Sequence, residues 1–289
     1  MSVWQRLAPF ALSLLLAACA APQQSRPIAP EAAARGIQLV RALPEALPSQ
    51  LSKVPDSQYL LVFAQSTALA VLDGLNPLPI SLTAPIAGAL QDREAGELKD
   101  RYASADPFVI ASERFKGSPL LTGRPDALRT MPLVYLVQDN EAVFRASLVL
   151  RAEGEGWMGR YLCHLPSPWT EAQVKTAEPA MLGQLRTELQ QCGDVLRQLM
   201  ERDARGQLKG DGRRMIFGSY HLVGGRVAGM MPASMVAFPD AEVLEETADH
   251  VVLRAPGEPG KSAREGALAY GVHYFRRDQL HTYKPAPAH

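Results

Sequence analysis

The stretch that decides the fold is Ala142 to Leu165, which reads AVFRASLVLR at 142–151, EGEG at 153–156 and WMGRYLCHL at 157–165. Apolar and polar residues alternate in both flanking segments, as in strands that bury one face. The glycines between them are typical of a turn, so we expect an antiparallel hairpin. With EGEG as the turn, Leu148 faces Tyr161, Ala146 faces Cys163 and Phe144 faces Leu165. This pairing points Cys163 into the core.

A long helix is expected after the hairpin. Thr170 and Gln173 have the spacing of a capping box, although Pro179 can instead mark the start of the longer helix. Apolar residues then recur at spacings of three and four, which predicts an amphipathic helix over about 179–204 packed on the sheet. The stripe consists of Met181, Leu185, Leu189, Cys192, Leu196 and Leu199. Cys192 therefore lies on the buried face.

Cys163 and Cys192 are both expected to face the same core. If the helix packs its stripe on the hairpin, the two sulfurs meet, provided that the Cα atoms come within about 7 Å. We predict a disulfide between them; the alternative is two buried free thiols.

The flanking segments add strands and helices without a regular alternation of the two. We expect helices at 31–43 and 87–102 and extended segments at 59–63, 108–111 and 133–137. The turn-rich region 116–132 is the expected boundary if there are two subdomains. The overall prediction is an α+β fold with a mainly antiparallel sheet.

The C-terminal part is expected to consist of antiparallel strands. Gly224-Gly225 would join strands at 215–223 and 226–231, and Val251 to Arg254 is another strand candidate. Segments 268–275 and 280–283 would form a last hairpin across a turn at 276–279, which pairs His281 with Tyr274.

The start of the chain has the layout of a secretory signal. Met1 to Arg6 carries a single charged side chain, Leu7 to Leu16 is nearly all apolar, and small residues lead into Cys19. The apolar run is shorter than the roughly 20 residues that a membrane-spanning helix needs. We therefore expect an export signal at 1–18.

Leu16-Ala17-Ala18-Cys19 resembles the lipobox of bacterial lipoproteins. The resemblance covers only about the first twenty residues. It implies that Cys19 carries a diacylglyceryl group and a third acyl chain, which together suffice for stable membrane anchoring. Ala20 is not the aspartate associated with inner-membrane retention, so the resemblance implies the periplasmic leaflet of the outer membrane.

The mature chain would then consist of a tether and a globular domain. Residues 19–56 are rich in proline and alanine and are expected to form a lipid-anchored, partly helical tether, and 57–285 the periplasmic domain. Loss of Arg6 leaves 29 basic against 30 acidic residues, a formal charge of −1. This balance gives no reason to expect nucleic acid as a partner. In an exported protein, Cys163 and Cys192 meet an oxidising compartment, which favours the disulfide.

Three patterns are weak indications of chemistry. Ala255 to Ser262 resembles a phosphate loop but lacks its first glycine, and Gly154 to Gly159 fits a dinucleotide pattern but precedes a strand. The histidines form no HxH or HExxH array, and no GxSxG or SxxK motif occurs. We expect no nucleotide, other cofactor or metal.

The most basic segment is 202–214, with Arg205, Lys209, Arg213 and Arg214. These side chains would contact lipid headgroups, lipopolysaccharide or an anionic partner, or they would form a solvated helix end. The sequence favours a non-catalytic envelope component that binds or assembles with a protein partner. The alternative is an envelope hydrolase acting on peptidoglycan, glycan or ester, so enzymatic activity stays open.

Overall fold

The computed structural model describes residues 26–41, 52–62, 92–139, 143–155, 157–222, 233–256 and 270–287. These residues form a mixed α and β fold dominated by an 11-stranded, mostly antiparallel sheet. The strand order is β11-β7-β8-β9-β10-β6-β5-β4-β3-β2, and β1 pairs with β4 outside this path. The α+β prediction is confirmed at this level.

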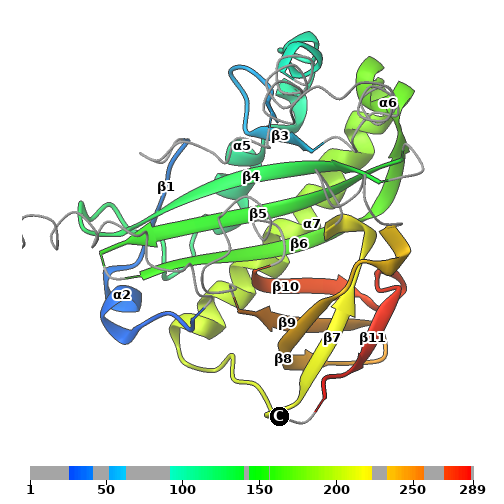
Figure 1. The fold of residues 1–289 in the computed structure, drawn as a ribbon. Coiled ribbons are helices and arrows are strands. Elements are labelled where there is room, and N and C mark those ends of the chain that lie inside the picture. Colours follow the sequence, from blue (N-terminus) through cyan, green and yellow to red (C-terminus); the bar gives the residue numbers. More distant parts are fainter. Residues whose placement is uncertain are drawn as a thin grey trace, which may run out of the picture.

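The strands fall into a long-stranded half and a C-terminal half (Figure 1). The first half contains β1 Ile37–Leu39, β2 Ser52–Lys53, β3 Tyr59–Val62, β4 Leu128–Gln138, β5 Val143–Gly154 and β6 Trp157–Thr170. The second contains β7 Arg214–Gly218, β8 Phe238–Glu246, β9 His250–Ala255, β10 Gly271–Arg276 and β11 Thr282–Pro285. The halves join where β10 runs parallel to β6, with Val272, His273 and Tyr274 opposite Tyr161, Leu162 and Cys163.

The predicted β5–β6 hairpin is present, but its register differs from the expected one. Gly154 pairs with Trp157, so the turn contains two residues rather than four, and Leu148 lies opposite Cys163 instead of Tyr161. Two-residue turns match the natural twist of paired strands. Because the side-chain period is also two, the shift leaves every side chain on its expected face.

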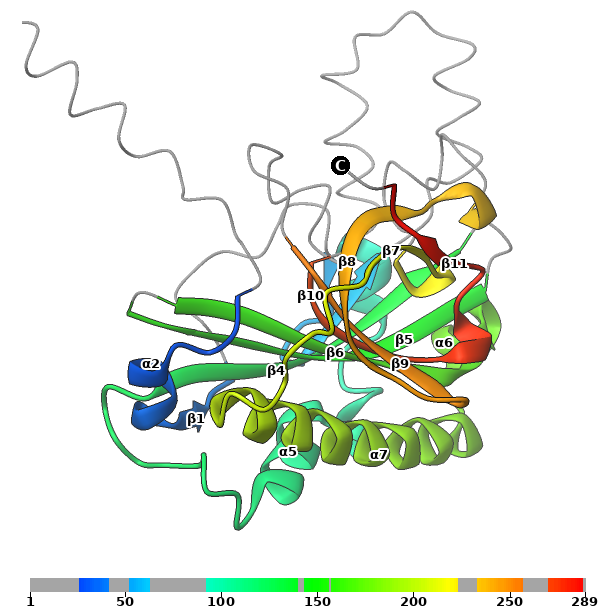
Figure 2. The same ribbon diagram turned by 90° about the horizontal axis from the view of Figure 1, so that it is seen from below.

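Helices cover one face of the sheet. Helix α7 (Pro179–Ala204) lies beneath the long strands together with α5 (Pro107–Phe115) in Figure 2. All six residues of the predicted apolar stripe on α7 are buried. The helical layer is therefore larger than the single long helix that the sequence predicts.

The capping box at Thr170 and the proline at 179 each mark the start of a helix. Thr170 and Gln173 form a complete capping box that opens a short helix, α6 (Glu171–Thr176), and Pro179 then opens α7. Ala177 adopts a left-handed conformation between the two helices. The two possible start positions that the sequence offers for one helix thus belong to two consecutive helices.

The prediction of an extended segment at 108–111 is wrong, because these residues belong to α5. Asp106 accepts hydrogen bonds from the backbone N–H groups of Phe108 and Val109, and Pro107 occupies the first turn. Four apolar residues in a row fit either a strand or a buried helix segment. The cap and the proline decide for the helix.

Part of the expected tether belongs to the folded domain. Helix α2 (Pro30–Arg35) ends at Gly36 with φ 73°, well before the expected end at Leu43, and β1 follows it at once. β1 pairs with β4, and Ile28 and Ile37 are buried. Within region 116–132, the expected boundary, β4 begins at Leu128 and then pairs with the earlier strand β3.

Other expected segments are shorter than predicted or only partly described. A helix occupies 92–97 within the expected 87–102 and is followed by turns and a 3₁₀ helix at Ala103–Ala105, whereas 87–91 lie outside the described residues. The strand at 59–63 is present as β3 up to Val62.

The predicted pairing of the last C-terminal hairpin is wrong, whereas the predicted Gly224-Gly225 turn lies outside the described residues. β7 ends at Gly218 and a 3₁₀ turn, η4 (Tyr220–Leu222), follows; the expected turn and return strand at 224–231 lie outside the described residues. β10 pairs with β9 and β6, whereas β11 pairs with β7, so His281 does not face Tyr274. The 3₁₀ helix η6 (Arg277–Gln279) replaces a tight turn and carries the chain to β7.

Candidate functional site

A cleft of about 570 Å³ lies at the joint between the halves. One wall is α7, with Glu188, Gln191 and Val195, and another is the β6–β10 joint. The turn between β8 and β9 and the 3₁₀ helix η6 complete the rim. Because segments from both halves line it, the shape of the cleft depends on how the halves meet.

A disulfide between Cys163 and Cys192 lines this cleft. The Cα atoms are 5.5 Å apart, and both residues are almost completely buried. The predicted disulfide is thus confirmed. It ties α7 to β6 and fixes one wall of the cleft.

Charged groups at the rim are mostly paired with one another. Arg276 donates to Asp278 at 3.0 and 3.1 Å, and Arg277 lies 2.6 Å from Glu246. The carboxylate of Glu188 is held by neutral donors, namely the backbone N–H and the hydroxyl of Ser167 and the amide of Gln184. The cleft therefore combines a polar rim with the apolar side chains of Val195 and Tyr274.

Three histidines lie on the other face of the same joint. His164 follows Cys163 on β6 and His273 precedes Tyr274 on β10, so strand alternation places both rings on the opposite face from Cys163 and Tyr274. His164 nevertheless contributes to the lining of the cleft. The Nε2 atom of His164 is 3.1 Å from Nδ1 of His273, and the ring centre of His221 on η4 is 5.1 Å from that of His164. All three residues are at most 3 % exposed. We call them the histidine cluster.

Neutral hydrogen-bonding groups surround the histidine cluster. The hydroxyl of Ser147 is 2.7 Å from Nδ1 of His164, and Nε2 of His221 donates to the carbonyl oxygen of Leu165 at 3.0 Å. The ring of Phe275 stacks on His164 with centres 4.0 Å apart. Such surroundings favour uncharged imidazoles.

The pKa values of two of these rings are lowered. Burial lowers the pKa of His164 well below its ordinary value, and the neighbouring rings of His221 and His273 add to the effect. Burial also lowers the pKa of His221 to about 4, assisted by the charge of Arg145, although the Leu165 carbonyl and Asp278 oppose the shift. Both rings are therefore neutral near pH 7.

The Ser147–His164–His273 arrangement resembles a nucleophile with two bases by distance alone. Ser147 is only 2 % exposed and lies on the central strand β5. A nucleophile must reach the substrate atom that it attacks. The buried hydroxyl does not meet this requirement in the described conformation.

A second, smaller hollow of about 350 Å³ lies near the end of α7. Asp203, at its base, accepts hydrogen bonds from the Tyr161 hydroxyl at 2.5 Å and from Arg254 at 3.0 Å. Burial raises the pKa of Asp203, although Arg254 and Tyr161 counteract this effect. Because Tyr161, Asp203 and Arg254 come from β6, α7 and β9, this network connects the two halves.

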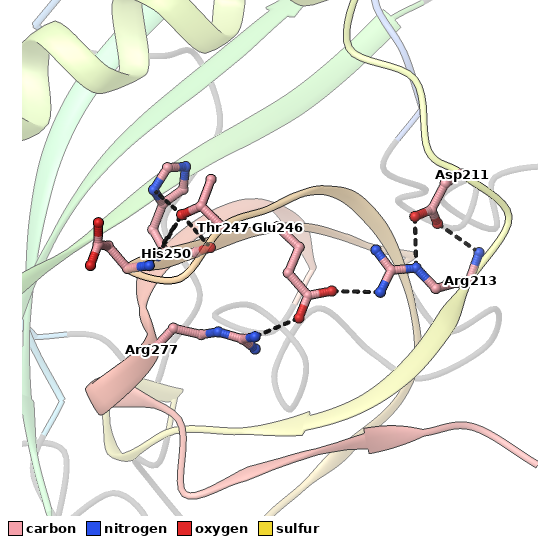
Figure 3. A network of polar contacts seen from close by, with 7 residues as sticks. Asp211, Arg213, Glu246, Thr247, His250 and Arg277 are labelled. Atoms are coloured by element: carbon pink, nitrogen blue, oxygen red, sulfur yellow. Dashed lines mark hydrogen bonds and ion pairs between the residues drawn. The ribbon is translucent and has the colours of Figure 1, made fainter.

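The four basic residues of the predicted anionic contact are exposed but do not form one free patch. Arg213 pairs with Asp211 and Glu246, and Figure 3 shows Arg213 and Arg277 reaching the same Glu246 carboxylate. Arg214 pairs with Asp240, Arg205 donates to Gln207, and Lys209 lines the second hollow. Acidic neighbours thus balance much of the positive charge.

Several sequence candidates are placed differently or lie outside the described residues. Cys19 and 257–262 of the phosphate-loop pattern lie outside them. Gly154 sits at the end of β5 before the β5–β6 turn, as expected for a turn and not for a dinucleotide motif. Within the described ranges, no group of His, Cys, Asp or Glu side chains is arranged to hold a metal ion, and no helix is long and apolar enough to cross a bilayer.

The sequence did not predict the histidine cluster. Its members are 57 and 52 residues apart along the chain, and they meet only because β10 lies parallel to β6. No short motif encodes that pairing. Searches of protein-family models, curated proteins and solved structures found no match to this chain.

Proposed function

We propose that this protein is a lipid-anchored component of the bacterial envelope that binds or assembles with a protein partner in the periplasm. Cys19 would carry the lipid and hold the domain at the periplasmic leaflet of the outer membrane. The activity is binding rather than catalysis.

The observation that carries this proposal is the buried Cys163–Cys192 disulfide. Disulfides persist in oxidising compartments such as the periplasm and are rare in the cytosol. The bond therefore agrees with the export signal and with the resemblance of Leu16 to Cys19 to a lipobox. Two separate parts of the sequence support the same compartment.

The cleft beside the disulfide is the proposed binding site. Its polar rim and apolar walls are typical of surfaces that recognise a partner by shape and a few polar contacts. The disulfide and α7 hold one wall, which reduces the entropy lost on binding. Gln191 is exposed on this wall and suits a test by substitution.

Crosslinking and pull-down of the tagged protein from intact cells test the proposal. We expect a reproducible partner that is lost when Gln191→Trp fills the cleft. Arg186→Trp places the same bulk on an exposed position of α7 outside the cleft and should keep the partner. Recovery of no partner, or equal recovery with both variants, would contradict binding at the cleft.

An envelope hydrolase is the second candidate, because Ser147 and His164 are in hydrogen-bonding distance. A Ser147→Ala variant assayed on peptidoglycan and ester substrates tests it. Activity in the original protein that disappears in this variant would favour the hydrolase.

A further inference from the structure

The β6–β10 joint has the histidine cluster on one face and the cleft on the other. Cys163, His164 and Tyr274 line the cleft, and the ring of His164 meets that of His273 on the other face of the joint. The direct pairing of the two strands covers only three residues of each. A change in the histidine cluster therefore acts on a short connection between the halves.

The hydrogen bond between His164 and His273 requires that one ring nitrogen donates and the other accepts. A neutral imidazole has one nitrogen of each kind, whereas a protonated imidazole has two donors. If the accepting ring is protonated, both nitrogens of this contact, which are 3.1 Å apart, carry a hydrogen and repel each other. The added proton also leaves a positive charge in a buried site. The closed joint thus disfavours uptake of a proton.

The described contacts of His164 are with neutral groups. Ser147 on β5, Ser219 between β7 and η4, and Phe275 on β10 are neutral. The charged groups that act on His221 are Arg145 on β5 and Asp278 on η6, and each is already engaged, Arg145 with Asp139 and Asp278 with Arg276.

We propose that the joint is an acid-sensitive switch: uptake of a proton by the His164–His273 pair opens the β6–β10 pairing and reshapes the cleft behind it. Opening exposes the rings to water, where an imidazole accepts a proton near pH 6.5. Below pH 6.5, the equilibrium constant for opening therefore rises about tenfold per pH unit for each proton taken up. The effect on partner binding rests on the proposed function, but the opening itself does not.

Hydrogen exchange of the full-length protein, followed by mass spectrometry at pH 7 and pH 5, tests the switch. After correction for intrinsic exchange rates, we expect protection of 271–276 to fall about 20- to 30-fold at pH 5. Protection of the α7 segment 185–199 should change much less. Equal losses in both segments would indicate general unfolding and overturn the proposal, as would no loss in either.

Substitutions assign the effect to the pair. His273→Asn removes the titrating ring and should abolish the pH dependence, and His164→Asn serves if the first variant does not fold. His250→Gln replaces a half-buried histidine of β9 that contacts Glu245 and stacks on Tyr274 but lies outside the histidine cluster, and it should leave the pH dependence intact. Unchanged pH dependence in the asparagine variants, or its loss in His250→Gln, would overturn the proposal. Because no partner or lipid enters this measurement, its failure leaves the proposed function untouched.

Discussion

The two halves of the sheet are stabilised by different kinds of interaction. The long strands β4 to β6 and α7 share one large apolar core, which the Cys163–Cys192 bond closes covalently. The C-terminal strands have a smaller core of their own, and this half also contains His221 and His273 of the histidine cluster and ion pairs such as Arg213–Glu246. Apolar burial and a covalent bond depend weakly on pH and salt, whereas buried imidazoles and ion pairs depend on both. Changes in pH and salt concentration should therefore affect the stability of the two halves differently.

Removing the disulfide should produce the largest effect. The two cysteines are 29 residues apart, and a loop of that length implies about 3 to 4 kcal/mol of stabilisation by restriction of the unfolded chain. We expect the Cys163→Ala/Cys192→Ala variant to lose this amount in urea unfolding. Cys19→Ala should unfold like the original protein, and a loss under 1 kcal/mol in the double variant would contradict the role of the bond.

Acid should destabilise the histidine-containing half next. Since the pKa of His221 is lowered to about 4, the unfolded state binds more protons below pH 6.5. Stability is therefore complete above pH 6.5 and lost as the pH falls towards 4, at about 1.4 kcal/mol per pH unit. By pH 5 His221 alone accounts for about 2 kcal/mol. His221→Gln, which keeps a donor for Leu165, should lose that much less between pH 7 and pH 5 in urea titrations; an identical loss would count against this assignment.

The Tyr161–Asp203–Arg254 network should show an intermediate effect, because it connects the halves. Tyr161→Phe removes the hydroxyl that donates to Asp203 and should cost about 1.5 kcal/mol in thermal or urea unfolding. Tyr135→Phe is a control on a buried tyrosine of the opposite sheet face. If Tyr161→Phe costs no more than its control, Asp203 does not depend on this donor.

The surface ion pairs should contribute least. Glu246 pairs with Arg213 and Arg277, and its side chain is 19 % exposed. Glu246→Gln should cost under about 1 kcal/mol in low salt and almost nothing in 1 M NaCl. A cost that persists in high salt would show that packing, rather than charge, is responsible.

The same contrast explains which features the sequence predicts. Local periodicity encodes the hairpin faces, the stripe on α7 and hence the meeting of Cys163 and Cys192, because each depends on neighbours along the chain. The turn length was wrong by two residues, but a side-chain period of two kept Cys163 on the correct face. The Thr170 capping box was predictable for the same reason.

No short sequence pattern encodes the pairing of strands that are far apart in the chain. β10 passes to β6 rather than forming a hairpin with β11, so the histidine cluster and half of the cleft arise from strands far apart in the chain. The helix at 107–115 was missed because its apolar run fits two structures, although Asp106-Pro107 marked its start.

We propose that Cys19 carries the membrane anchor and that the domain is exported. Intact-mass measurement of the protein from cell membranes tests it most directly. We predict a chain that begins at Cys19 and has the added mass of its acyl groups, and a Cys19→Ser variant that lacks this mass. A chain that still begins at Met1, or one with an unmodified Cys19, would contradict the account.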